Sequence, residues 1–162
     1  MATTIVPSNL TVSIIESYTL NEVSYGNTMT KTYVDNDQVS QRVMSISKST
    51  IGSETNIFTD ILSLDTVDGR GQVVKTNYRY FRINNLDTAN TLNLRFFTTG
   101  TEYVAVKVSP ASTFLLMDNG LDTPANATTA ISFAEISAIA GQSSSTTEDI
   151  DVEFIMVTGD NS

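Results

Sequence analysis

The sequence predicts an all-β protein, folded as a β-sandwich or a β-barrel. Its 162 residues include 24 Thr, 18 Ser and 13 Asn, and these residue types are unfavourable inside helices. Thr, Val, Ile, Tyr and Phe instead fit a pleated, half-buried surface. Short alternating runs recur between turn signals about every 8–12 residues, a spacing typical of sandwiches and barrels. Apolar residues make up 40% of the chain, too many for a disordered protein.

In the first half of the chain, period-two alternation marks each expected strand. Residues 10–14 alternate, with a continuation to Leu20, and turns are expected at 25–27 and at 35–37. The remaining strands of this half are expected at 29–34, 42–47, 57–64 and 73–83. Asp68-Gly69-Arg70-Gly71 is the clearest turn, because Gly supplies the positive φ that tight turns need.

In the second half, strands are expected at 91–97, 103–108, 114–117 and 150–157. Alternation should place Leu92, Leu94 and Phe96 on one face of the first of these strands. Residues 131–139 fit either a helix or a strand, since Ala and Glu favour helix while Ile131 and Phe133 alternate. The expected organisation is an arm at 1–9, one domain at 10–158 and a short tail at 159–162. We expect no secretory signal and no membrane-spanning segment.

Composition excludes several classes of function. The chain has no Cys and no His, so it lacks the thiolate nucleophile, the imidazole base and the usual ligands of zinc, copper and haem. Its net charge of −9 disfavours binding to nucleic acid or to anionic membranes. All nine Lys and Arg residues precede residue 108, which indicates either a bipolar surface or an ordinary solvated face.

The clusters of Asp, Asn and Glu do not indicate a catalytic or calcium site. The carboxylate candidates are Asp35/Asp37, Asp65/Asp68 and Asp149/Asp151/Glu153, and a calcium candidate spans 118–122. We interpret the first two pairs as turn residues, the third set as a solvated strand face, and the fourth as a turn without the ligand spacing of an EF-hand. We therefore expect no enzyme activity, no metal and no cofactor.

Two apolar runs suggest an interface. Residues 114–117 and 154–157 are apolar at every position, although a sandwich strand usually shows one face to water. Either loops or another subunit must cover the second face, and we expect a homo-oligomer. The candidate oligomer or capsid interface consists of Leu115, Met117, Ile155, Val157, Tyr80 and Arg82.

Several stretches resemble a family of small virion structural proteins of tailed bacteriophages. The similar segments are 15–21, 25–27, 41–43, 80–87, 106–115 and 151–154, of which Arg82-Ile83-Asn84-Asn85-Leu86-Asp87 is the most distinctive. Pro110-Ala111-Ser112 stands where a more Gly-rich loop is expected. The resemblance implies a capsid decoration (cement) protein with a jelly-roll-like sandwich, often trimeric, that binds the major capsid protein on the outside of the virion. It implies no catalytic residues.

Two other functions are alternatives to capsid decoration. One is a tail-associated or host-receptor-binding module of the virion. The other is a carbohydrate-binding sandwich, which would use exposed aromatic side chains. With no Trp in the chain, the candidates are Tyr25, Tyr33, Tyr78, Tyr80 and Tyr103.

Overall fold

The computed structural model describes residues 8–49, 59–62, 78–98, 103–117, 120–121 and 134–159. Every regular element in these ranges is a β-strand, so the predicted all-β class is confirmed. The strands are β1 (Ser8–Ile15), β2 (Tyr18–Leu20), β3 (Val23–Tyr25), β4 (Thr28–Ile46), β5 (Thr59–Leu62), β6 (Tyr78–Asn85), β7 (Leu92–Phe97), β8 (Tyr103–Val108), β9 (Thr113–Leu116), β10 (Gly120–Leu121), β11 (Ala134–Glu135), β12 (Ala138–Ser143) and β13 (Ile150–Gly159).

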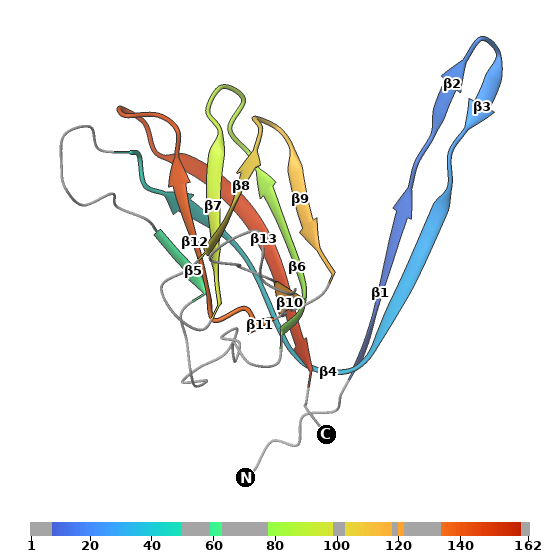
Figure 1. Cartoon of the computed structure of the whole chain (residues 1–162), viewed down its shortest axis with the longest axis horizontal. Coiled ribbons are helices and arrows are strands. Elements are labelled where there is room, and N and C mark those ends of the chain that lie inside the picture. Colours follow the sequence, from blue (N-terminus) through green and yellow to red (C-terminus); the bar gives the residue numbers. More distant parts are fainter. Residues whose placement is uncertain are drawn as a thin grey trace, which may run out of the picture.

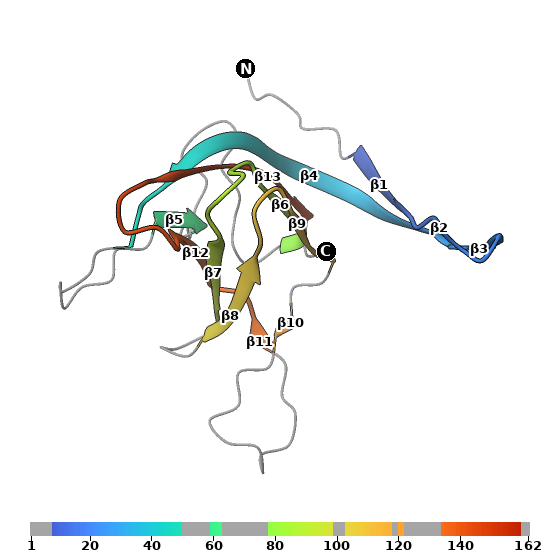
Figure 2. The ribbon, with the colours of Figure 1, turned by 90° about the horizontal axis from the view of Figure 1, so that it is seen from above.

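Two antiparallel sheets pack face to face as a sandwich (Figures 1 and 2). The five-stranded sheet has the order β1-β4-β13-β6-β9, and the four-stranded sheet has the order β5-β12-β7-β8. Within the described residues, these nine strands are close to the eight expected. The pairs β2-β3 and β10-β11 form two further short ribbons. β1 begins at Ser8 and β13 ends at Gly159, and most of the expected arm at 1–9 and of the expected tail at 159–162 lies outside the described residues.

The strands of the two sheets are paired in a nested way. β7 pairs with β8, β6 with β9, β5 with β12 and β4 with β13. Each successive pair joins strands that lie farther apart in the sequence. The acidic C-terminal β13 therefore lies between β4 and β6, which carry basic residues, and Glu153 forms an ion pair with Arg82 at 3.5 Å.

The core lies between the sheets and follows the predicted alternation. In β7, Leu92, Leu94 and Phe96 are buried while the residues between them are half-buried. In β13, Asp151 and Glu153 point away from the core, as predicted. The ring centroids of Phe96 lie 6.0 Å from Phe81 and 5.5 Å from Phe114, which joins the two sheets. The buried cluster comprises Ile46, Phe81, Ile83, Leu92, Leu94, Phe96, Val108, Ile136, Ile139, Ile150, Val152, Phe154 and Met156.

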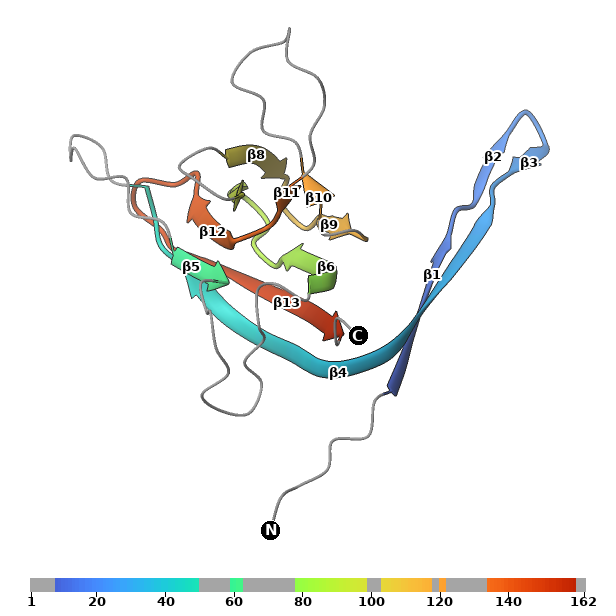
Figure 3. The same cartoon turned by 60° about the horizontal axis from the view of Figure 1, so that its bottom comes forward.

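One strand, β4, belongs to two parts of the molecule (Figure 3). Its second part pairs with β13, and its first part pairs with β1 in a hairpin that extends away from the sandwich. From here on, the arm means residues 8–35, in place of the arm expected at 1–9. The expected turn at 35–37 is wrong. Asp35 has φ 54° and the register of β1 against β4 shifts opposite Ser8, so this cluster forms a bulge inside a continuous strand.

The bulge is held by the buried amide of Asn36, which donates to the carbonyl oxygens of Ser8 at 2.9 Å and Tyr33 at 2.8 Å. The chain reversal of the arm also differs from the expected turn at 25–27. It occurs at Asn21 and Glu22, with φ of 50° and 67°, in the two-residue form that matches strand twist.

A buried asparagine ties together two loops at one end of the sandwich. The Nδ2 of Asn85 donates to the carbonyl oxygens of Asn90 at 2.9 Å, Ser109 at 3.2 Å and Val108 at 3.3 Å. Its Oδ1 accepts from the backbone N–H of Asp87 at 3.1 Å. Asn85, which lies in the segment most distinctive of the family resemblance, thus links the β6–β7 and β8–β9 loops by hydrogen bonds. We call these contacts the Asn85 staple.

The β8–β9 loop contains the Ala that stands in the expected Gly-rich position. Ala111 has φ 51°, a left-handed conformation that glycine adopts more easily. Its N–H donates to the carbonyl oxygen of Asp87 at 2.8 Å. Farther along the chain, the ambiguous segment 131–139 contains β11 and the start of β12, while its first three residues lie outside the described ranges.

Candidate protein-contact surface

A groove of about 340 Å³ runs along the outer face of the five-stranded sheet. One wall is the arm, where β1 contributes its alternate apolar side chains Leu10, Val12 and Ile14. The rest of the lining comes from β6, β9 and β13. On β6, β9 and β13, alternation explains the position of the lining residues, because residues next to them in each strand point into the core between the sheets. The complete lining is Leu10, Thr11, Val12, Ser13, Ile14, Tyr80, Arg82, Thr113, Leu115 and Ile155.

The structure brings the six expected interface residues together on this face. Tyr80, Arg82, Leu115 and Ile155 line the groove. Met117 and Val157 belong to an apolar cluster that also contains Tyr80, Leu115 and Ile155. These residues come from β6, the end of β9 and β13, three neighbouring strands of one sheet. The two runs that are apolar at every position, 114–117 and 154–157, therefore contribute side chains to one face of this sheet.

The chain itself covers part of that surface. Val157 is fully buried and Tyr80 is 5% exposed, whereas Leu115, Met117 and Ile155 are half-buried. The cover comes from residues of the arm that pack in the same cluster, namely Leu10, Val12 and Tyr33. A strand hairpin of the same chain thus supplies cover that we had expected from loops or from another subunit.

Polar contacts fix the base of the arm to the sandwich. The Tyr33 hydroxyl donates to the carbonyl oxygen of Met117 at 2.9 Å. The ammonium group of Lys31 lies 3.4 Å from the same oxygen and 4.8 Å from the centre of the Tyr33 ring. The rings of Tyr33 and Tyr80 are 6.1 Å apart, in the range of favourable aromatic pairs. These contacts join the first part of β4 to the end of β9.

The packing at the base of the arm affects the titration of Tyr80. Burial raises the pKa of its phenol above 10.0, and the neighbouring Tyr33 raises it further, while the Arg82 guanidinium opposes the rise. The neutral phenol is therefore favoured over the phenolate even more than in water, as suits a side chain in an apolar cluster.

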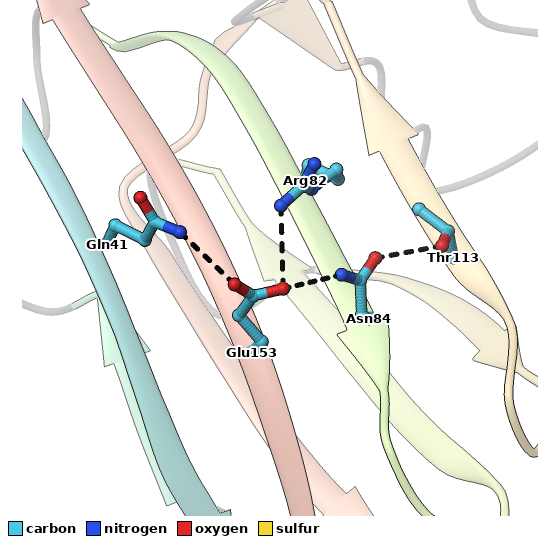
Figure 4. Close-up of polar contacts among 5 residues, drawn as sticks. All are labelled: Gln41, Arg82, Asn84, Thr113 and Glu153. Carbon is cyan, nitrogen blue, oxygen red and sulfur yellow. Dashed lines mark hydrogen bonds and ion pairs between the residues drawn. The ribbon is translucent and has the colours of Figure 1, made fainter.

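A ladder of polar side chains crosses four strands beside the groove (Figure 4). Glu153 on β13 accepts from Gln41 on β4 at 3.1 Å and from Asn84 on β6 at 2.7 Å, in addition to its ion pair with Arg82. The Asn84 carbonyl oxygen accepts from the Thr113 hydroxyl on β9 at 2.8 Å. These contacts give both carboxylate oxygens of Glu153 a partner, while the Arg82 Nε is buried without one among the described residues. Glu153 therefore serves to fix strand positions.

Exposed apolar side chains concentrate on the arm and the following part of β4. Nine of the eleven large apolar side chains exposed in the described ranges lie between residues 15 and 43. We call them the apolar ribbon: Ile15, Tyr18, Leu20, Val23, Tyr25, Met29, Val34, Val39 and Val43. The other two are Leu86 and Tyr103. Exposed apolar patches mark protein or membrane interaction sites or ligand-binding grooves.

Sequence reasoning did not identify the apolar ribbon. Its signal was present in Tyr18-Thr19-Leu20 and Val23-Ser24-Tyr25, which flank the two-residue turn. β2 pairs only with β3, so neither face of this hairpin packs on the core. Alternation shows that a strand has an apolar face but not which surface covers it.

The remaining candidates do not assemble into a site. Asp149 accepts from the backbone N–H of Lys48 at 2.8 Å, a structural role. Asp65/Asp68 and most of the calcium candidate at 118–122 lie outside the described residues. Where the structure does describe the chain, it shows no group of three or more His, Cys, Asp or Glu placed to hold a metal ion. The same ranges contain no helix capable of crossing a bilayer.

The tyrosines considered for carbohydrate binding are dispersed. Tyr25 lies at the distal end of the arm, Tyr33 and Tyr80 lie at its base, and Tyr103 lies on β8 of the other sheet. The side chain of Tyr78 is outside the described set. These four rings therefore do not form one platform for a sugar.

Comparison with known proteins adds no family: no protein-family model, curated protein or solved structure matches the chain.

Proposed function

We propose that this chain is a capsid decoration protein of a tailed bacteriophage. It binds the major capsid protein on the outside of the shell as a homotrimer and reinforces the contacts between coat subunits. It acts through buried area, without catalysis or a cofactor. The proposal starts from the family resemblance, which covers segments of the arm, β4, β6, β8, β9 and β13.

The apolar ribbon is the observation that carries a protein-binding role. Val43 is 63% exposed and Ile15 is 74% exposed, although both lie on ordered strands. A soluble monomer rarely exposes so many large apolar groups on one hairpin and the strand that continues it, and such groups become buried when proteins associate. The half-buried groove residues Leu115 and Ile155 extend this surface on the same sheet.

The fold and charge support the proposed setting. The nested pairs β7-β8, β6-β9, β5-β12 and β4-β13 agree with a hairpin rolled into two sheets, which favours the jelly-roll arrangement. The net charge of −9 suits a protein that surrounds packaged DNA without binding it.

The first test is localisation and reinforcement in particles. Virions are purified, this chain is located by density or labelling, and stripped shells are compared with reloaded shells for resistance to heat and low salt. We expect the chain over the shell and greater resistance after reloading. Equal resistance of stripped and reloaded shells would exclude reinforcement, and density at the tail would assign the chain to the alternative tail or receptor module.

A single substitution tests the role of the apolar ribbon. Val43→Glu places a charge on the outer face of β4, and we expect binding to stripped shells to weaken by about tenfold or more. Thr146→Glu makes the same charge change at an exposed, β-branched loop residue outside the ribbon and should bind normally. Thr146→Glu should unfold like the original chain. Val43 lies directly opposite Glu153 in the pairing of β4 with β13, so Val43→Glu should lower the free energy of unfolding by up to about 1 kcal/mol, and shell binding is compared at a temperature where both variants are fully folded. Equal shell binding by both variants contradicts the role of the ribbon.

A further inference from the structure

The four-stranded sheet carries a second surface hollow, on the side of the sandwich opposite β4. Its volume is about 310 Å³, and it is lined mainly by the outward side chains of β7 and β8. Among the lining residues that the structure describes, two are cations, Arg95 and Lys107, and none is acidic. The lining residues are Asn93, Leu94, Arg95, Tyr103, Ala105, Val106, Lys107 and Gln142.

Aromatic and cationic groups stack beside this hollow. The Arg95 guanidinium lies 4.3 Å from the centre of the Tyr103 ring. The rings of Tyr103 and Phe97 are 5.6 Å apart. Tyr103 is 44% exposed and is one of the two exposed large apolar side chains that lie outside the apolar ribbon. We call Arg95, Phe97, Tyr103 and Lys107 the platform.

The distal part of the arm has the complementary chemistry. We call residues 15–29 the tip. It contains Glu16 and Glu22, and no Lys or Arg precedes Lys31 in the chain. The rings of Tyr18 and Tyr25 pair at 6.2 Å and both are more than half exposed. An acidic, aromatic tip thus corresponds to a basic, aromatic platform, and complementary charge favours such contacts.

We propose that the tip of one copy of this chain docks on the platform of a second copy. Figure 2 shows β7 and β8 below β4, with the arm leaving toward one side, and in all three views the tip lies apart from its own platform. The contact therefore joins two different surfaces of two copies. Each copy supplies one tip and one platform, so a closed symmetric assembly uses all of them.

Docking also explains why an extended tip is part of the fold. A two-stranded hairpin alone in water is marginally stable, and β2 and β3 pair only with each other. Burial of Tyr18 and Tyr25 against Tyr103 and Phe97 would supply the apolar contacts that the tip lacks in one chain. This inference does not rest on the proposed function, because self-association and shell binding use separate assays.

A charge exchange tests the contact. Sedimentation velocity on the full chain measures self-association of the original protein, of Glu22→Lys, of Lys107→Glu and of the double variant. We expect each single variant to raise the dissociation constant about tenfold, and the double variant to return within about threefold of the original. Glu148→Lys and Lys48→Glu are exposed control substitutions away from both surfaces and should leave association unchanged. Urea unfolding verifies that every variant is folded.

Three results would overturn the proposal. One is a monomeric original chain up to about 100 µM, a concentration at which even weak specific dimers form. Another is a double variant that associates no better than the singles. The third is a Glu22→Lys variant that self-associates normally but no longer binds stripped shells, which assigns the tip to the coat protein. If the double variant restores self-association but the chain does not reinforce shells, only the proposed function is refuted.

Discussion

The Asn85 staple provides the sharpest test of how the sandwich is held together. Asn85→Asp keeps the size of the side chain and its Oδ1 acceptor but removes the two N–H donors. Those donors serve three carbonyl oxygens, of Asn90, Val108 and Ser109. Asn85 is only 2% exposed, so water does not readily replace them. The new carboxyl group would also face three oxygens that repel its negative charge.

The expected loss of stability follows from these contacts. Two N–H groups shared among three carbonyls amount to about two hydrogen bonds, each with a net contribution of about 1 kcal/mol. The Val108 contact is buried, and a stranded buried carbonyl adds about 1–3 kcal/mol. The free energy of unfolding should therefore fall by about 3–5 kcal/mol. That is a large part of the roughly 5–15 kcal/mol available to a domain.

Urea unfolding at neutral pH measures this change. The matched control is Asn9→Asp, an exposed residue with the same charge change, which we expect to stay within about 0.5 kcal/mol of the original. Protonation lets the new carboxyl donate one bond, so its folded-state pKa should be raised and the deficit should shrink as pH falls toward about 5. A loss below about 1 kcal/mol at an unchanged m value would refute the staple.

Three further predictions concern single groups. Backbone N–H groups, above all that of Asn90, hold the pKa of the Asp87 carboxyl below 3.8. The stabilisation by this carboxylate is therefore complete above pH 3.8 and is lost as pH falls through the folded-state pKa. In Asp87→Asn, the free energy of unfolding should change less with pH in the acid range. Burial raises the pKa of Tyr80 above 10.0, so stability is lost as pH rises beyond it, and Tyr80→Phe should reduce that alkaline loss in urea unfolding. In Gly26→Ala, the new Cβ meets the Glu16 carbonyl oxygen at a φ of 152°, so hydrogen exchange should accelerate in the arm while urea unfolding of the sandwich stays unchanged.

The sequence predicts the parts of the fold that depend on local alternation. Leu92, Leu94 and Phe96 face the core, and Glu153 faces outward, because a strand in a two-layer sandwich has only two faces. The runs 114–117 and 154–157, apolar at every position, likewise predicted apolar side chains on an outer face, where Leu115 and Ile155 line the groove. In each case the chemistry of a few neighbouring residues decides the outcome.

Long-range pairing could not be predicted in this way. Asp35-Asn36-Asp37 has the composition of a turn, and whether it reverses or bends the chain depends on β13, more than a hundred residues away, which pairs with the second part of β4. Individual charge pairs depend on the same long-range pairing. The C-terminal acids looked segregated in sequence, yet nested pairing places Glu153 beside Arg82.

The arm shows where stability and assembly have different requirements. Ordering a residue carries an entropic penalty of about 1–2 kcal/mol, which burial normally offsets. Ile15, Tyr18 and Tyr25 are ordered yet exposed, so the arm contributes little to the core of its own chain. Only its base, through Tyr33 and Leu10, packs on the sandwich. A rigid base with an uncovered tip presents apolar side chains in a fixed direction, which lowers the entropy lost when a partner binds. The apolar ribbon is therefore better explained by assembly than by folding.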